Sequence, residues 1–330
     1  AQKKLVRQIN ETELFPMEEI NCSNCNSDDY QVLYDNDRYG IKVKTVMCKK
    51  CGLVYTNPRM TKERADDFYK SDFYRVMYES DTFDSSVDYM INKSIEDFEV
   101  GKPDFSLNYP TLFVDFLESL NLEYDSVCEI GAGYGRNLLY LRKLGKKVSG
   151  IEPSSAITER AKEWDLEIKQ GVIEDLDTRS DLLMMRHVFE HLYDPVDSLI
   201  RIRKFVGKYL FIEVPGIVQS MASIQNAHNY YFTPNTLNSM LTKNGFKRIA
   251  LEWNQKTDFL FAVYEKCEAS KMASYHQQEE VDKILRIYNL DNFRQKYIEL
   301  SRSDVSSFFA NSARRSVNCV ACGFSESRPE

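Results

Sequence analysis

The sequence predicts an α/β protein with a doubly wound, mostly parallel sheet of seven strands, a small cysteine-rich N-terminal module and helical extensions. Three observations support this prediction. Short apolar runs alternate with amphipathic segments between residues 112 and 264, a glycine-rich turn joins one such run to the next helix, and two Cys-x-x-Cys pairs precede the alternation. Strand–helix alternation with short connections is typical of open sheets covered by helices on both faces.

Composition limits the class of protein. The 330 residues include 43 Lys and Arg against 50 Asp and Glu, a net charge of −7, and 43% are hydrophobic. This balance is typical of a folded chain of about two domains. No apolar run approaches the roughly 20 residues of a membrane helix, and the first residues lack the apolar stretch of a secretory signal. We therefore expect a cytoplasmic protein without a membrane partner, and the acidic balance disfavours a dedicated nucleic-acid binder.

The first four cysteines have the spacing of a metal site. Cys22 and Cys25 form one pair, and Cys48 and Cys51 form a second pair after 22 intervening residues. Two such turns aim four thiolates at one tetrahedral zinc ion, and a glycine directly after the last thiolate suits a zinc knuckle. Disulfides and a redox pair are the alternatives, and the absence of a signal peptide disfavours disulfides. With all four positions filled by protein, the zinc would be structural.

The elements before the alternation follow from local patterns. Short apolar runs at residues 31–34, 41–47 and 53–55 predict the strands of the zinc module. Residues 61–100 combine aromatic and acidic residues at helical spacing, which predicts a connector or cap. Tyr109 and Pro110 then open an amphipathic helix over residues 112–120.

The alternation itself supplies the sheet. Apolar runs predict strands at 126–130, 147–151, 168–170, 182–186 and 209–214, and amphipathic segments predict helices at 137–144, 155–164, 195–206 and 236–243. Two final strands, at 248–253 and 259–264, have no helix between them and should pair antiparallel at one edge. Residues 268–310 read as helical.

These patterns divide the chain into four parts. We predict a zinc module at residues 1–60, a helical connector or cap at 61–110, a cofactor-binding domain at 111–267 and a helical extension at 268–330. The flanking helices would form either a lid or the surface of a homodimer. A third pair, Cys319 and Cys322, has no second pair in the chain. Metal binding across a dimer, oxidation and an idle tail remain open for it.

The glycine-rich turn suggests a nucleoside ligand. Gly131, Gly133 and Gly135 follow a strand and open a helix, and Glu152 ends the next strand 21 residues after Gly131. In a βαβ unit such an acid faces a ribose and can accept hydrogen bonds from its hydroxyls. The third glycine comes one place too early for the dinucleotide fingerprint. Glu129, which precedes the turn, would repel a pyrophosphate but suits a cationic amino group, and S-adenosylmethionine carries both a ribose and an α-amino acid.

The turn and its acid resemble the first motif and the ribose acid of the class I S-adenosylmethionine-dependent methyltransferases, and the likeness covers about residues 110–265. The resemblance implies a Rossmann-like fold and an enzyme that binds this cofactor. It implies that residues after the third strand approach the adenine, although Val172 stands where many members have an acid. The cofactor contacts implied by the resemblance are Glu129, Gly131, Ala132, Gly133, Gly135, Glu152, Pro153, Val172, Ile173, Glu174, Arg186 and His187.

A segment after the fourth strand resembles the HVxEHLxDP segment of the same family. It runs from His187 through Glu190 and His191 to Pro195. In the family, residues around the first histidine lie beside the reacting sulfur and the substrate mouth. The resemblance therefore implies that His187 is a wall of the site and a candidate catalytic residue, and that His191 is a structural contact of the helix.

A further histidine, His228, lies in a loop that resembles that of sugar methyltransferases with a zinc module. A histidine that titrates near neutral pH suits an alcohol that loses its proton during methyl transfer, so His228 is the candidate base. The sugar C-methyltransferases of this type carry a Tyr-x-Glu-His cluster, whereas this chain has Gln225 and Ala227 at the Tyr and Glu positions. They also carry a second large domain.

The resemblance implies a methyltransferase of carbohydrate biosynthesis that acts at oxygen on a small polar acceptor, a sugar or a nucleotide-linked sugar. C-methylation of a keto-deoxysugar is one alternative. Methylation of RNA or protein, with the zinc module as a docking domain, is another. A non-enzymatic scaffold is the third alternative, and the complete glycine turn and Glu152 argue against it.

Overall fold

The computed structural model describes residues 16–70, 110–162, 164–218, 224–267 and 277–292, together with Val6 and Met221. The Cys319–Cys322 pair, most of the predicted connector and much of the C-terminal extension lie outside these residues. No helix in the described part combines the length and the apolarity that a membrane crossing needs.

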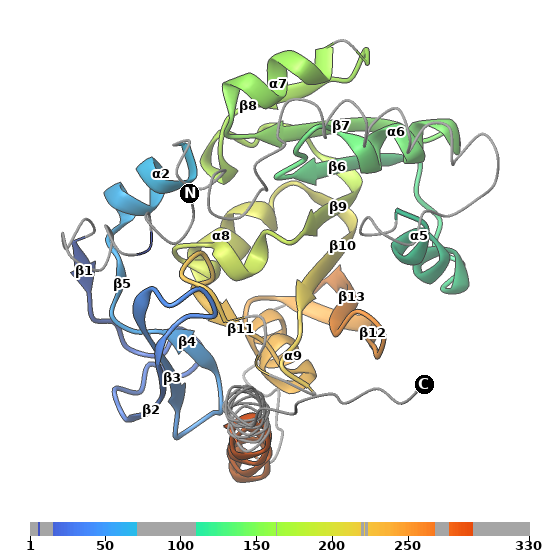
Figure 1. Ribbon diagram of the computed structural model, residues 1–330. Helices are drawn as coiled ribbons and strands as arrows, with labels where there is room; N and C mark the ends of the chain where they lie inside the picture. The colour runs from blue at the N-terminus through green and yellow to red at the C-terminus, as the bar shows by residue number, and fades with distance from the viewer. Residues whose placement is uncertain are drawn as a thin grey trace, which may run out of the picture.

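A seven-stranded sheet forms the centre of the fold (Figure 1), with the order β12-β13-β10-β9-β6-β7-β8. The strands β10, β9, β6, β7 and β8 run parallel. β13 is antiparallel to both β10 and β12, so the predicted antiparallel edge is confirmed. The strand bounds are β6 (Ser126–Ile130), β7 (Lys147–Glu152), β8 (Ile168–Gln170), β9 (Ser180–Arg186), β10 (Val206–Pro215), β12 (Phe246–Asn254) and β13 (Phe259–Lys266). The predicted α/β class is confirmed.

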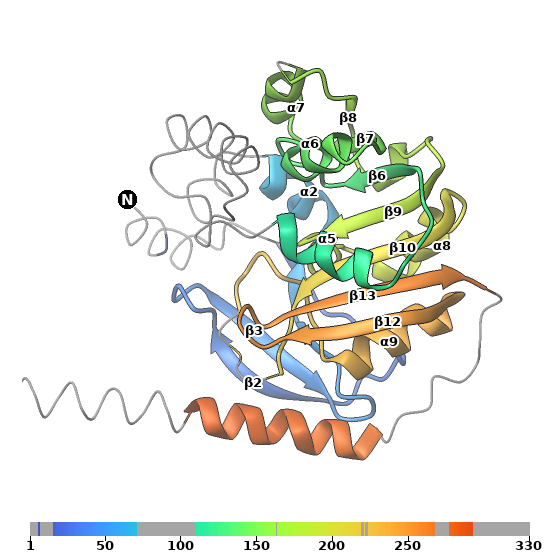
Figure 2. The same ribbon diagram turned by 90° about the vertical axis from the view of Figure 1, so that its right-hand side faces the viewer.

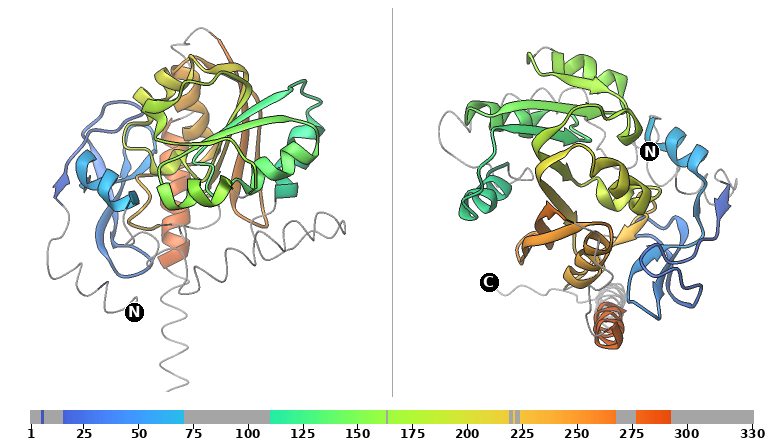
Figure 3. Two further views of the ribbon diagram at one scale, coloured as in Figure 1. Left: turned by 90° about the horizontal axis from the view of Figure 1, so that it is seen from above. Right: turned by 180° about the vertical axis from the view of Figure 1, so that it is seen from behind.

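Helices cover both faces of this sheet. Alternate residues of β9 point to opposite faces: Leu182 and Met184 pack toward one core cluster, Leu183 and Met185 toward another. The first face carries α5 (Pro110–Ser119) and α6 (Arg136–Lys143), followed by α7 (Ser155–Lys162), and the second carries α8 (Pro195–Ile202) and α9 (Pro234–Lys243). The views from above and behind show the two layers (Figure 3).

One predicted helix is too long. The segment predicted to be helical over residues 195–206 ends at Ile202. Val206 is instead the first residue of β10, where it pairs with Ser180 of β9. The apolar residues Phe205 and Val206 continue the helical pattern of the sequence, but the short connection to β10 needs them in a turn and a strand.

The cysteine-rich module forms its own sheet of four strands, β11-β4-β3-β2. Its strands are β2 (Tyr30–Asn36), β3 (Lys42–Cys48), β4 (Val54–Thr56) and β11 (Tyr230–Tyr231), with a separate pair, β1 (Met17–Glu18) and β5 (Arg59–Met60), and the helix α2 (Lys62–Lys70). β11 follows β10 in the chain but pairs antiparallel with β4. The module and the loop between β10 and α9 therefore share one sheet.

A helix at residues 277–292 packs beneath this module (Figure 2). Its apolar residues Val281, Ile284 and Ile287 join Met47 and Val54 in one buried cluster. At its start, the buried Glu280 accepts a hydrogen bond from Asn235 Nδ2 of α9 at 2.6 Å. This helix ties the module to the part of the chain that follows the central sheet.

Candidate active site

The glycine turn lies at the carboxyl end of β6, where β6 passes into α6. Gly133 has φ +52° and a Cβ placed on it would meet no atom of the described residues within 4 Å, so the described part of the chain leaves space beside this point of the turn. Gly135 has φ +75° and a Cβ there would overlap Leu166. Gly135 is therefore needed for packing, whereas Gly133 leaves room for a ligand to approach the backbone.

Glu152 is held beside this turn by the backbone. Its Oε2 accepts from Gly133 N at 3.1 Å and its Oε1 accepts from Ser154 N at 3.0 Å. The side chain is 8% exposed. Each carboxylate oxygen can accept a further hydrogen bond, so the orientation suits the two hydroxyls of a ribose.

Glu129 is buried in β6 and only half of its carboxylate is engaged. Its Oε1 accepts from Asn137 Nδ2 at 2.7 Å, and its Oε2 has no hydrogen-bond partner among the described residues. Burial raises the pKa of Glu129 to about 8, although Arg186 and Asn137 oppose the shift. An unpartnered buried oxygen is costly, and the ammonium group of a methionine moiety would satisfy it.

The guanidinium of Arg186, at the end of β9, is hydrogen-bonded to other side chains of the protein. Its guanidinium donates to both carboxylate oxygens of Glu213, at 2.6 and 3.0 Å, and to Asn137 Oδ1 at 2.5 Å. Burial alone would raise the pKa of Glu213, but Arg186 and His187 hold it at about 2. Arg186 therefore positions Asn137, which in turn orients Glu129, rather than presenting its charge to a ligand.

His187 follows directly, with φ +54°. Its Nε2 lies 3.1 Å from Glu213 Oε1 and its Nδ1 lies 3.6 Å from Glu190 Oε1. Burial lowers the pKa of His187, but the two carboxylates outweigh it and raise the pKa to about 9. The ring also packs edge-on against Phe259, with centroids 4.6 Å apart. The structure places His187 at the carboxyl edge of the sheet, as its motif suggested.

His228 lies deeper, under the cysteine-rich module. It is 5% exposed, and its Nε2 contacts Gln225 Nε2 at 2.5 Å. Thr56 of the module donates to its backbone carbonyl at 2.8 Å. Its ring meets that of His191 at 4.8 Å in an edge-to-face arrangement. The two histidines, together with His187 and Glu190, therefore form one group at the end of β9, which we call the histidine group.

The segment expected near the adenine follows β8. Val172 is 37% exposed, whereas Ile173 is buried in the core cluster of the sheet. Glu174 is exposed and forms an ion pair with Lys62 of α2 at 3.4 Å. Gly171 N donates to Glu152 O at 3.0 Å, which holds this segment beside the ribose acid. Ala132 lies within the glycine turn and Pro153 directly after Glu152.

The four N-terminal cysteines converge. Cys22 Sγ lies 3.5 Å from Cys51 Sγ, and Cys25 Sγ lies 3.5 Å from Cys48 Sγ. All four sulfur atoms lie within 4.8 Å of one another. Four thiolates at 2.3 Å from a tetrahedral zinc ion would be separated by about 3.8 Å, so the cluster can hold such an ion with little movement.

Sequence reasoning missed three site residues. Asn137 bridges Glu129 and Arg186, Glu213 pairs with Arg186, and Glu190 faces the histidine group. Glu213 had a signal, because it is an acid within the apolar run at residues 209–214. Asn137 begins the helix predicted after the glycine turn, and Glu190 lies in the segment that resembles HVxEHLxDP, but nothing in their spacing assigns them a contact.

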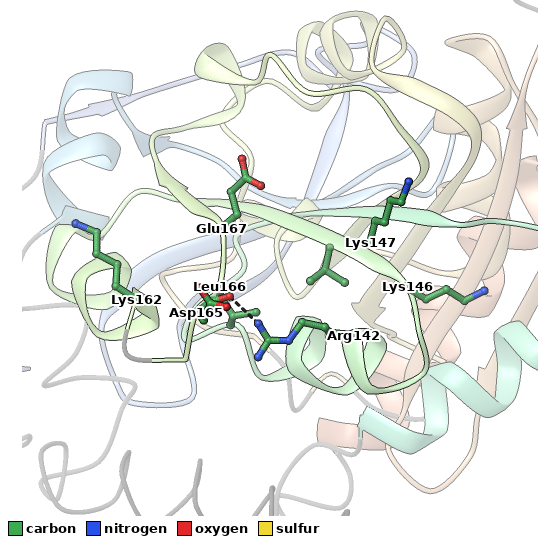
Figure 4. A pocket seen from close by; sticks show the side chains of 8 residues that line it. Arg142, Lys146, Lys147, Lys162, Asp165, Leu166 and Glu167 are labelled. Carbon is green, nitrogen blue, oxygen red and sulfur yellow. Dashed lines mark hydrogen bonds between the residues drawn. The ribbon is translucent and has the colours of Figure 1, made fainter.

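An open pocket elsewhere carries none of this chemistry. It lies at the amino ends of β7 and β8, opposite the glycine turn, and Arg142, Lys146, Lys147 and Lys162 line it with Asp165 and Glu167 (Figure 4). Arg142 donates to the carbonyl of Asp165 at 2.6 Å, and the lysine side chains point outward. These mixed charges are typical of a solvated surface.

The strand order and the glycine turn, with Glu129 and Glu152 at the carboxyl edge, agree with the class I S-adenosylmethionine-dependent methyltransferase domain that the sequence predicts. In agreement, residues 107–251 match the family model described as a methyltransferase domain. The chain therefore contains such a domain, and the prediction of an enzyme of this class is confirmed. Nothing in these matches tests the roles predicted for individual site residues.

Solved structures of methyltransferases are similar at low identity. A magnesium protoporphyrin IX methyltransferase from Synechocystis PCC 6803 with bound S-adenosylmethionine is 14% identical, with a TM-score of 0.42 over 62% of this chain and 96% of that one. A TehB-like methyltransferase from Corynebacterium glutamicum is 18% identical, with a TM-score of 0.40 over 55% and 98%. Neither likeness bears on substrate. The comparison with curated proteins found no match.

Gly133→Ala should separate folding from cofactor binding. The new Cβ would stand in the space left for the ligand, so we expect S-adenosylmethionine to bind at least about tenfold more weakly. Forcing an L-residue to positive φ should cost about 1–2 kcal/mol of stability. Gly145→Ala is the matched control, because Gly145 has φ +81° and also has open space around its Cβ position. Calorimetry should show normal affinity for Gly145→Ala, and equal affinities for both variants would contradict the placement.

Cofactor binding should release a proton from Glu129. Its pKa in the folded chain, about 8, lies above its usual 4.5, so the folded chain keeps a proton between these pH values. A ligand ammonium favours the ionised carboxylate, so at pH 7 binding should release about one proton, and affinity should rise with pH by up to about tenfold per unit below pH 8. Calorimetry in buffers of different ionisation enthalpy measures the release, which Glu129→Gln should abolish. An affinity that does not change between pH 6 and pH 8 would contradict the assignment of Glu129 to the ammonium group of the cofactor.

Cys48→Ser should release a metal from the cysteine cluster. Loss of one thiolate should cost more than about 3 kcal/mol of stability in the module, as measured by denaturant unfolding with metal content by mass spectrometry. Cys267→Ser is the control, because Cys267 lies outside the cluster. Unchanged metal content in Cys48→Ser would show that Cys48 is no ligand.

Proposed function

We propose that this enzyme transfers a methyl group from S-adenosylmethionine to a hydroxyl oxygen of a small polar acceptor, a sugar or a nucleotide-linked sugar. The observation that carries the donor half of the proposal is the pair formed by the open backbone at Gly133 and the unpartnered Oε2 of Glu129. Together they fit a ligand that needs close backbone approach at one point and offers a cation at another.

Each cofactor-binding residue has a separate task in this proposal. Glu129 holds the ammonium group, and Glu152 accepts from the ribose hydroxyls. Val172 and Ile173 flank the adenine through apolar contact. When bound, S-adenosylmethionine supplies an electrophilic methyl group. The residues of the chain supply orientation, which is the larger part of catalysis for a displacement of this kind.

The acceptor half rests on the histidine group. A hydroxyl that attacks a methyl group must lose its proton, and histidine nitrogens are the usual acceptors near neutral pH. His187 presents a partly exposed side chain, 28% accessible, at the carboxyl edge of β9, while His228 is buried. We assign proton removal to His228. His187 is the second catalytic residue, and because its pKa is raised to about 9 it carries a proton near neutral pH and can donate a hydrogen bond to the acceptor oxygen.

A structural zinc ion in the cysteine cluster supports the same site. Thr56 of β4 donates from Oγ1 to His228 O at 2.8 Å and from its backbone nitrogen to Asn229 O at 3.0 Å. Asp37 of the module accepts from Asn226 N at 3.0 Å. A zinc ion that fixes the module would therefore also fix the loop that carries His228.

Methyl-labelled cofactor, incubated with the enzyme and an extract of its source cells, tests the acceptor class. We expect label in the small-molecule fraction. His228→Ala should lower the rate by about 100-fold or more, the usual effect of losing an acid–base group, with cofactor affinity retained. Glu152→Ala should weaken cofactor binding at least about tenfold, because charge-assisted hydrogen bonds are lost. Glu118→Gln, at an exposed position of α5, is the control and should label normally.

Two outcomes of this experiment would contradict the proposal. Label in RNA or protein would overturn the acceptor class and favour the module as a docking domain. Label attached to carbon in the isolated product would overturn methylation at oxygen and favour a keto-sugar.

A further inference from the structure

Glu190 presents an unusual buried charge. It is 1% exposed, and neither of its carboxylate oxygens has a hydrogen-bond partner in the described part of the chain. His187 Nδ1 is 3.6 Å from Oε1, too far for a hydrogen bond, and Glu213 holds the other side of that ring. A buried carboxylate without hydrogen bonds is strongly unfavourable unless a cation or a metal compensates it. His187 lies between Glu190 and the closer Glu213, so its one positive charge is shared by two buried acids.

His191 is oriented toward this carboxylate. Its Nδ1 lies 2.7 Å from Ala227 O, so Nδ1 carries the proton and donates it to that carbonyl. Its Nε2 lies 3.8 Å from Glu190 Oε1, on the side of the ring that faces this carboxylate. A histidine that donates one ring nitrogen to a backbone carbonyl and points the other at a carboxylate has the orientation of a metal ligand.

His228 completes the set. Ligand atoms of Glu190, His191 and His228 all lie within 4.8 Å of one another. In a site with bonds of 2.0–2.1 Å and tetrahedral geometry, ligand atoms are separated by about 3.4 Å. The 3.8 Å between Glu190 Oε1 and His191 Nε2 is close to this value.

We propose that Glu190, His191 and His228 bind one divalent transition-metal ion, separate from the cysteine cluster. Two imidazoles and one carboxylate suit zinc, cobalt or iron(II) and differ in chemistry from four thiolates. Three protein ligands leave a coordination position open, as in catalytic rather than structural sites. A His228 that binds the metal through Nδ1 and donates from Nε2 has no nitrogen left to accept a proton, so in the metal-bound enzyme the role of ligand replaces the role of base that the proposed function gives to His228. Metal binding itself does not rest on the proposed function.

The surroundings of His228 set a condition on this site. Gln225 contacts Nε2 of His228, so we assign Nδ1 of His228 as the metal-binding nitrogen. This assignment requires that Nε2 carries the proton and that the side-chain oxygen of Gln225 faces it. The nitrogen–nitrogen distance of 2.5 Å is shorter than hydrogen bonds of this type allow. Exchanging the amide oxygen and nitrogen gives Nε2–H···Oε1. Arg38, which meets the other end of the amide at 2.5 Å, is exposed and can turn into solvent.

Metal counting tests the proposal on the full chain. Wild type equilibrated with zinc, with excess removed, should hold two zinc ions per chain by mass spectrometry, and Glu190→Gln should hold one. Titration should show the second ion bound at least about tenfold more weakly in Glu190→Gln. Glu118→Gln is the control and should match wild type. Circular dichroism and cofactor affinity establish that Glu190→Gln is folded.

Cobalt substitution gives a readout that needs no variant. The thiolate site should show thiolate-to-cobalt charge transfer, and a second equivalent should add weak ligand-field bands without further charge transfer. A wild-type chain that binds one metal only, or a second metal unaffected by Glu190→Gln, would overturn the proposal. Two metals in a chain that labels no acceptor would support this site and contradict only the proposed function.

Discussion

The burial of carboxylates along one edge of a parallel sheet is the constraint on which the site depends. Glu129, Glu213 and Glu190 are each 1% exposed at or just beyond the carboxyl ends of β6, β10 and β9. Such groups must be neutralised, paired or offered to a ligand. Arg186 forms an ion pair with Glu213 and donates a hydrogen bond to Asn137. Asn137 in turn donates to Oε1 of Glu129, and Oε2 of Glu129 has no hydrogen-bond partner among the described residues. Among the described residues, one oxygen of Glu129 beside the cofactor turn and both oxygens of Glu190 beside the histidine group therefore remain without hydrogen bonds.

The cysteine-rich module extends this order to the acceptor side. β11 belongs by sequence to the catalytic domain and by pairing to the module's sheet. Two residues of the module bond to the backbone of the loop that carries His228: Asp37 accepts a hydrogen bond from it, and Thr56 donates one to it. The hydroxyl of the buried Tyr230 lies 2.8 Å from Ser23 Oγ of the module and donates to Tyr193 O at 3.3 Å. The module is therefore part of the wall of the site, and its stability and the geometry of the histidine group are coupled through backbone hydrogen bonds.

Backbone features were predictable from the sequence because they depend on local pattern. The strand predicted at 126–130 matches β6, and that at 168–170 matches β8. Side-chain pairing was not predictable. Arg186 was assigned to the cofactor from its place in a motif. The pairing of β9 with β10 instead sets it directly opposite Glu213, and the sequence alone does not predict that register. The contact between His191 and His228, 37 residues apart, likewise depends on the chain passing from β10 of the central sheet to β11, which pairs with the module.

Charge also links the two halves of the site. Around the carboxyl edge, Glu152, Glu190 and Glu213 face two cations, Arg186 and His187, and Glu129 adds a fourth acid when it loses its proton. The balance stays acidic, so a cationic donor is attracted more strongly than a neutral one in this low-dielectric setting. Methyl transfer converts a sulfonium into a neutral thioether and removes one positive charge beside these acids. The spent cofactor should therefore be held less tightly than the donor, so the arrangement that attracts the donor also favours release of the product.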